Sequence, residues 1–373
     1  MKTLKRIALS LATSVIRHLY SDERAQFVGN VARPSELARI VARLPLAERI
    51  SFIHEILPLD QYVPALDRQT RYQLLAKCSE SLSVESIRVS SRLGSYEGSP
   101  LDKIITASYC INGTWAPKLQ AILAKLFPDG NGSFLDIGAN IGLTCIPIAR
   151  ARRVNCYVFE PGPENYRMLL RNIDANDVSA FVHAKQLALY SEAGVMNFEL
   201  SSVNFGDHRL RDKNATVSVG DLFAEGGRNV IEVKTIRLDD AISVDSLTHP
   251  VIMKIDTQGA EVHVLDGAAK TLEQTDVIIC EVSPYHLARM GHTVEMLLDR
   301  LTAFKYAAIV QFDELLHDHN NDQYNSIEPI AGEMGVVRQR ILELSVNTSP
   351  DNYFDVVFSR RPFAELISPK PPG

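Results

Sequence analysis

The sequence has no apolar run of about 18 residues, the length that a membrane-spanning helix requires. Its five cysteines are an odd number, are widely spaced and form no Cys-x-x-Cys pair. This spacing argues against a disulfide framework and a zinc site, and it favours buried thiols in a reducing compartment, so we expect a cytoplasmic protein. Lys2, Lys5 and Arg6 precede an apolar run similar to a signal peptide, but Arg17 and His18 end that run early.

The sequence also lacks an excess of positive charge. Its net charge of −6 argues against a protein that binds nucleic acid through many phosphates. The first 50 residues nevertheless hold nine lysines and arginines against four acids, a net +5, which leaves −11 for the remainder. This basic segment could contact a partner or the anionic face of a membrane as a peripheral protein; the alternative is an ordinary solvated helical face.

The length of 373 residues predicts more than one domain, and 46% hydrophobic residues suffice for a large core. Apolar residues at helical spacing predict helices over 35–44, 46–57 and 68–82. We therefore divide the chain into a helical N-terminal extension, residues 1–100, and a main domain, residues 101–373.

In the main domain, predicted strands alternate with predicted helices. This order is typical of an α/β, Rossmann-like sheet that is mostly parallel, with helices on both faces and an antiparallel final strand. Pro147, inside the first of the helices that alternate with the strands, is expected to kink it. The predicted strands are 133–137, 155–159, 181–189, 251–255, 277–282 and the antiparallel pair 306–312 and 353–359; a hairpin-like pair is 195–200 with 230–238; the helices are 118–127, 141–151, 163–175, 260–272 and 294–301.

Two of these strands end in a carboxylate followed by a glycine: Asp136 with Gly138, and Asp256 with Gly259. Ligands of open α/β sheets bind at the edge where parallel strands end. Gly138 permits a tight turn and a close approach of the backbone to a ligand. Glu160, at the end of the next strand, is placed to accept hydrogen bonds from both hydroxyls of a ribose.

Two glycines of the dinucleotide fingerprint are missing, because Asn140 and Leu143 stand in their places. A pyrophosphate would therefore lack its close contact with the backbone. S-adenosylmethionine has no pyrophosphate, and its amino group and sulfonium suit nearby carboxylates. The residues thus favour S-adenosylmethionine over a nicotinamide dinucleotide as the cofactor.

Several motifs in this order resemble the FkbM-type S-adenosylmethionine-dependent methyltransferases, over roughly residues 105–361. They are the block Leu135 to Gly142, Phe159-Glu160-Pro161, the helix asparagines Asn165, Asn172 and Asn176, Ala188-Leu189-Tyr190-Ser191, Leu238-Asp239-Asp240, the block Lys254 to Glu261, and Glu281. The resemblance implies a class I methyltransferase fold. It also implies O-methylation of a hydroxyl in a sugar, glycolipid, polysaccharide or secondary metabolite.

The resemblance also implies a cofactor site. Asp136, Gly138, Asn140 and Gly142 would line the methionine end, Glu160 would bind the ribose, and Leu187, Ala188 and Leu189 would contact the adenine. The sequence departs from the family at Gln258, where a glutamate is usual. This departure puts in doubt any role that needs a charge there, including metal binding beside Asp256, and we expect no metal site.

A sugar hydroxyl is a poor nucleophile, so a proton acceptor is expected. Asp256 with His286 as acceptor or relay is our interpretation, and Glu261 is a further catalytic candidate. Alternatively, Asp256 binds the amino group of the cofactor, and Glu261 only neutralises the positive end of a helix.

Two polar segments have less specific patterns. The segment 201–228 is long for a connector and is either an acceptor-recognition loop, through Asp207, His208 and Arg209, or a simple insertion. The cluster His317-Asp318-His319 has a metal-like spacing, but its polar surroundings favour a solvated loop.

Three functions remain: a methyltransferase acting on a small molecule or glycan, a cofactor-binding module without turnover, and a nicotinamide-dependent oxidoreductase. Binding of S-adenosylmethionine without a methylated product would indicate the second, and binding of NAD would indicate the third.

Overall fold

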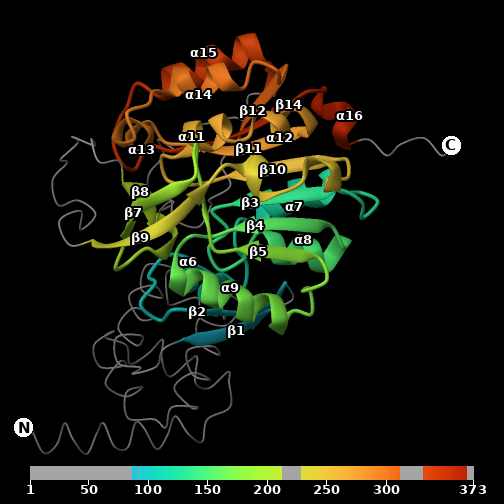
Figure 1. Ribbon diagram of the computed structural model, residues 1–373. Helices are drawn as coiled ribbons and strands as arrows, with labels where there is room; N and C mark the ends of the chain where they lie inside the picture. The colour runs from blue at the N-terminus through green and yellow to red at the C-terminus, as the bar shows by residue number, and fades with distance from the viewer. Residues whose placement is uncertain (1–85, 92, 212–227, 311–330, 368–373) are drawn as a thin grey trace, which may run out of the picture. The chain divides into compact units, whose positions relative to one another are not determined.

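The computed structural model describes residues 86–91, 93–211, 228–310 and 331–367 (Figure 1). The chain divides between Trp115 and Ala116 into two compact units, which are described separately. The three predicted N-terminal helices, the basic first 50 residues and the cluster at His317 lie outside the described residues. No helix in the described ranges has the length and apolar character needed to cross a membrane.

The described part of the first unit is a hairpin and one helix. The hairpin pairs β1 (Ile87–Ser91) with β2 (Gly94–Gly98), and α6 (Ile105–Asn112) follows. The carboxylate of Asp102 accepts the N–H groups of Ile105 (3.1 Å) and Thr106 (2.8 Å), so it caps the start of α6. Tyr96 and Tyr109 pack edge to face, with ring centroids 4.9 Å apart.

The second unit is built on an eight-stranded sheet in the order β13-β12-β14-β11-β10-β3-β4-β5 (Figure 1). Its central strands are parallel, and β14 runs antiparallel between β11 and β12. The predicted α/β fold is therefore confirmed, including the antiparallel last strand. In chain order the strands are β3 (Ser133–Ile137), β4 (Asn155–Phe159), β5 (Val182–Lys185), β10 (Val251–Ile255), β11 (Val277–Val282), β12 (Tyr306–Val310), β13 (Ala331–Glu333) and β14 (Phe354–Ser359).

Helices lie in two groups on this sheet. Every residue of β10 is buried, which explains why all of them except Lys254 are apolar. One group packs with β10, β11 and β14 into the main core, and Figure 1 shows α14 and α15 side by side near β12. The helices are α7 (Pro117–Leu126), α8 (Cys145–Arg152), α9 (Pro163–Ala175), α10 (Leu238–Ala241), α11 (Glu261–Asp266), α12 (Ala269–Gln274), α13 (Pro284–Arg289), α14 (Val294–Arg300), α15 (Met334–Leu344) and α16 (Phe363–Ile367).

A smaller sheet is inserted between β5 and β10, in the order β6-β9-β7-β8. The predicted hairpin-like pair forms its centre, with β7 antiparallel to β9. Its strands are β6 (Ala188–Leu189), β7 (Gly194–Leu200), β8 (Arg209–Arg211) and β9 (Asn229–Ile236).

The prediction of one strand over 181–189 is wrong, because the chain turns at Gln186. The N–H of Leu187 donates to the carbonyl of Lys185 (3.0 Å), which ends β5. The next two residues, β6, then pair with β9 in the smaller sheet.

Two of the predicted helices have different bounds in the structure, in each case because of a glycine. The first begins at Cys145 and not at Ile141, because Gly142 has a φ of 90° that no α-helix contains. Pro147 is therefore the third residue of α8, and the carbonyl of Leu143, which receives no N–H from Pro147, accepts a hydrogen bond from Gln120 Nε2 (2.9 Å).

The predicted helix 260–272 is broken at Gly267 into α11 and α12. A Cβ at Gly267 would lie 2.1 Å from the carbonyl oxygen of Tyr190, so the backbones touch there. Asp239 of the Leu-Asp-Asp motif then caps α12, because its Oδ2 accepts from Lys270 N and its Oδ1 from Thr271 N, both at 2.9 Å. Helices α6, α10, α13, α15 and α16 were not predicted.

Candidate active site

The loop after β3 is a tight turn that requires glycine at position 138. Gly138 has a φ of 81°, and a Cβ there would lie 1.8 Å from the carbonyl oxygen of Asp256. Its N–H donates to the carbonyl of Phe159 at the end of β4 (3.0 Å). The ends of β3, β4 and β10 therefore meet at this point, as expected for a ligand-binding edge.

Glu160 follows β4, and backbone N–H groups hold its carboxylate. Oε2 accepts from the N–H of Asn140 (2.9 Å) and Oε1 accepts from that of Gly162 (2.7 Å). Burial raises the pKa of Glu160 to about 7, while the two backbone donors act in the opposite direction. The structure thus brings two predicted cofactor-binding residues, Asn140 and Glu160, into direct contact.

Asn140 also ties this loop to the segment before β8. Its Nδ2 donates to the carbonyl of Phe205 (2.9 Å), and Nδ2 of Asn165 in α9 donates to the same oxygen (3.0 Å). A Cβ on Gly162 would lie 3.6 Å from the ring of His208, so this histidine lies near Glu160. Part of the polar segment 201–228 is therefore next to the predicted ribose site.

Asp136, Lys254 and Asp256 form a row across β3 and β10. Lys254 Nζ lies 3.0 Å from Asp256 Oδ2 and 3.8 Å from Asp136 Oδ1. Neither oxygen of the wholly buried Asp136 accepts a hydrogen bond from a nitrogen or oxygen donor within the described ranges. Burial raises the pKa of Asp136 and Lys254 lowers it. The cationic group that Asp136 meets in this structure is therefore a lysine of the chain itself.

Gln258 joins Asp256 to the end of β11. Its Nε2 donates to Asp256 Oδ1 and to Glu281 Oε1, both at 2.9 Å. Burial and the neighbouring Asp256, Asp355 and Glu261 raise the pKa of Glu281 well above its usual value. An amide at position 258 therefore connects two carboxylates.

Glu261 is turned toward the backbone. Its Oε1 accepts from the N–H groups of Thr257 (3.0 Å) and Gly259 (3.1 Å) and from the Thr257 hydroxyl (2.9 Å). This geometry favours the structural alternative, in which Glu261 stabilises the turn before α11 and the start of that helix.

The structure does not place His286 against Asp256 within the described ranges. His286 Nε2 lies 3.2 Å from Arg209 Nη1 and 3.8 Å from Asp207 Oδ1. A guanidinium can only donate, so Nε2 is the acceptor in that contact. Arg209 itself is buried and donates to Glu199 Oε2 (3.1 Å) and Asp207 Oδ1 (3.1 Å), so it serves an internal network.

The predicted adenine contacts differ in burial. Leu187 is half-buried, whereas Ala188 and Leu189 are buried in β6, and Leu189 packs into the main core. Of the three, Leu187 retains the largest accessible surface for a ligand.

Sequence reasoning missed Lys254 and the bridging amide of Gln258. A lysine inside an otherwise apolar buried strand, two residues before an aspartate, signals a buried ion pair, so Lys254 could have been found. The described residues contain no group of three or more His, Cys, Asp or Glu side chains that could hold a metal. Of the five cysteines, the four in the described ranges are free and buried, as expected.

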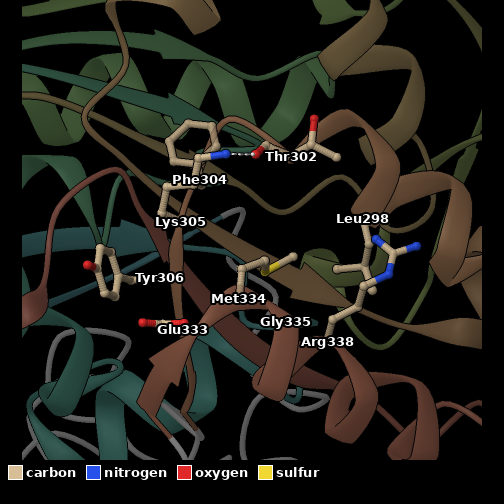
Figure 2. A pocket seen from close by; sticks show the side chains of 9 residues that line it. All are labelled: Leu298, Thr302, Phe304, Lys305, Tyr306, Glu333, Met334, Gly335 and Arg338. Carbon is tan, nitrogen blue, oxygen red and sulfur yellow. Dashed lines mark hydrogen bonds between the residues drawn. The ribbon is translucent and has the colours of Figure 1, made fainter.

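A pocket of about 480 Å³ lies away from this site, around the amino end of β12 (Figure 2). Because β12 runs parallel to β11, this end faces the edge opposite the site. Figure 2 shows Met334 between Glu333 and Arg338, and no predicted site residue is among its nine lining residues.

The strand order, the glycine loop after β3 and the acidic residue after β4 define a Rossmann-like methyltransferase domain. The model of the methyltransferase FkbM domain matches residues 136–314. The methyltransferase sdnD of Sordaria araneosa is 31% identical over 176 residues, which cover 40% of this chain and 68% of that protein. The chain belongs to the FkbM methyltransferase family.

Two further relatives carry names that state a substrate or position. The hexuronic acid methyltransferase AglP of Haloferax volcanii is 27% identical over 149 residues, covering 39% of this chain and 54%, about half, of that protein. The 2-O-methyltransferase NoeI of Sinorhizobium fredii is 26% identical over 197 residues, covering 51% of this chain and 79% of that protein.

Proposed function

We propose that this chain is an O-methyltransferase that transfers the methyl group of S-adenosylmethionine to a hydroxyl of a sugar, glycolipid, polysaccharide or secondary metabolite. The observation that carries the proposal is the direct bond between the glycine loop and Glu160, from Asn140 N to Oε2. The name of AglP supports a sugar-type acceptor, and the name of NoeI supports transfer to an oxygen.

The residues at this edge fit the cofactor. Gly138 brings the loop backbone against β10 without a side chain, and Asp136 is a buried carboxylate beside it. Glu160 would accept the ribose hydroxyls, and Gly138, Asn140 and Gly142 would line the methionine end. Leu187 would contact the adenine. Such a cofactor supplies an electrophilic methyl carbon.

The chain itself supplies the orientation of the acceptor and a place for its proton. Asp256 is the candidate proton acceptor, because its side chain is 31% exposed at the strand edge while Lys254 holds one oxygen. The carboxylates of Asp256 and Asp136 raise the pKa of Lys254, while burial lowers it, so the lysine keeps its positive charge beside Asp256. Removal of the proton lets the hydroxyl oxygen attack in line.

Calorimetry and a product assay test this proposal. We expect heat on titration with S-adenosylmethionine and S-adenosylhomocysteine and none with NAD. Methyl glycosides of hexoses, 6-deoxyhexoses and hexuronic acids are then screened for release of S-adenosylhomocysteine and a mass increase of one methyl group. Heat with NAD would overturn the assignment, and binding without any product across a broad panel would favour a binding module.

A thermal-shift series locates the site. A ligand at 100 times its dissociation constant should stabilise the chain by about 2.7 kcal/mol. Glu160→Ala should abolish this shift, and an unchanged shift would remove Glu160 from the ribose site. Asp240→Ala, at a side chain that is 61% exposed, is the matched control and should leave the shift intact.

A further inference from the structure

The bridging amide of Gln258 has an unusual backbone conformation. Gln258 has a φ of 56°, in the left-handed region that glycine and asparagine adopt more readily than glutamine. The next residue, Gly259, also has a positive φ, 118°, and a Cβ there would lie 2.4 Å from the carbonyl oxygen of His286, so this position requires glycine. Backbone strain of this kind clusters at functional sites, so the contacts of the Gln258 side chain are of interest.

The side chain of Gln258 connects two groups that would otherwise repel each other. Its amide nitrogen has two N–H groups, and it lies 2.9 Å from both Asp256 Oδ1 and Glu281 Oε1. One N–H donor for each carboxylate satisfies this geometry. A carboxylate at position 258 would have no N–H to donate and would add a third acid.

The Asp256 carboxylate is therefore held from two sides. Lys254 Nζ contacts Oδ2 at 3.0 Å, and Gln258 contacts Oδ1. The side chain keeps 31% of its surface exposed, so the held carboxylate still reaches solvent. Fixing a reacting group in one orientation increases the rate of the step in which it takes part.

We infer that Gln258 is a positioning residue, which sets the orientation of the Asp256 carboxylate for proton acceptance and anchors it to Glu281. This inference rests on the proposed function, because Asp256 acts on the acceptor hydroxyl only in a methyltransferase. It adds Gln258 and Glu281 to the residues that serve the reaction.

The first test needs no acceptor. In the full chain labelled with ¹³C at glutamate carboxyls, the titration of Glu281 is followed by NMR and assigned with Glu281→Gln. The charged groups around Glu281 are Lys254 from β10, Asp256 directly after β10, Glu261 from α11 and Asp355 from β14. Gln258→Met keeps the length and backbone strain and removes both donors, so the midpoint of Glu281 should rise by about one pH unit. An unchanged midpoint overturns the inference.

The second test separates positioning from structural support. Gln258→Gly relieves the left-handed strain and should leave the melting temperature equal or higher, while kcat falls at least tenfold and the Kd for S-adenosylmethionine changes less than threefold. Arg153→Gly is the matched control: Arg153 has a φ of 54° at an exposed position, so the same relief should leave kcat unchanged. A Gln258→Gly variant with wild-type kcat overturns the inference.

These outcomes are distinct from failure of the proposed function. A chain that gives no heat with S-adenosylmethionine contradicts the proposed function, whatever the Glu281 midpoint shows. A chain that binds the cofactor and turns over normally with Met or Gly at position 258 contradicts only the inference.

Discussion

The two halves of the sheet edge hold their carboxylates by different means. At the β3–β4 edge, backbone N–H groups of Asn140 and Gly162 bind Glu160. At the β10–β11 edge, the side chains of Lys254 and Gln258 bind Asp256. The first arrangement depends on the path of the main chain, and the second depends on the identity of single side chains.

This difference assigns different roles to the two edges. A carboxylate held by the backbone stays in place through most side-chain changes nearby. This suits the binding of one cofactor that is used with many different acceptors. A group held by side chains can be retuned by one substitution, and Gln258 is such a position. Substitutions at the two edges and in the loop between them test this contrast.

Asp256→Asn should cause the largest loss of activity. It removes the proposed proton acceptor and one partner of Lys254, so kcat should fall by about 10² to 10⁴. The measurement is the initial rate of S-adenosylhomocysteine release with the acceptor that the screen identifies. A rate within threefold of wild type would exclude Asp256 as the acceptor of the proton.

Gly138→Ala should cause the largest loss of stability. The new Cβ would lie 1.8 Å from the carbonyl oxygen of Asp256, and the residue would keep a φ of 81°. We expect the free energy of unfolding in urea to fall by about 3 kcal/mol or more. Gly291→Ala is the control: its φ is 76° but nothing lies within 4 Å, so strain alone should cost about 1 kcal/mol. Equal losses of unfolding free energy in the two variants would contradict the close approach of Gly138, after β3, to Asp256, after β10.

Glu160→Gln should weaken S-adenosylmethionine binding about tenfold or more, because hydrogen bonds to a charged acceptor are lost. Burial raises the pKa of Glu160 from 4.5 to about 7, so the folded chain keeps a proton there that the unfolded chain releases above about pH 4.5. This group therefore makes folding less favourable as pH rises from about 4.5 to 7.

Binding should have the opposite pH dependence. Ribose hydroxyls donate to the ionised carboxylate, so the affinity of the wild type should fall as pH drops below about 7. Calorimetry at pH 6 and pH 8 measures this change, and the dependence should be absent in Glu160→Gln. A wild-type affinity that is equal at both pH values would contradict the ribose assignment.

His286→Gln should have the smallest effect. His286 accepts a bond from Arg209 and belongs to the internal network with Asp207, so kcat should fall less than tenfold. The same rate assay measures this. A loss as large as that of Asp256→Asn would restore the predicted proton relay between the two residues.

The parts of the fold that follow local rules could be predicted from the sequence. Strands β3, β4, β10 and β11 have the predicted bounds, because each is an apolar run between turn residues. The contact between Glu160 and the glycine loop also follows from the local pattern, because the two come directly after the neighbouring strands β4 and β3.

The parts that depend on distant contacts could not be predicted. The break at Gly267 reflects a close approach by Tyr190, and the turn at Gln186 sends β6 to a different sheet. His286 contacts Arg209 of the inserted smaller sheet, a residue 77 positions away in the sequence. No local pattern in the sequence contains these contacts.

A crystal structure of the chain with S-adenosylhomocysteine locates the cofactor site. We expect both ribose hydroxyls to donate to Glu160 and the methionine end to lie along Gly138 to Gly142. A nucleoside bound at any other part of the chain, with Glu160 still buried by protein, would contradict this site.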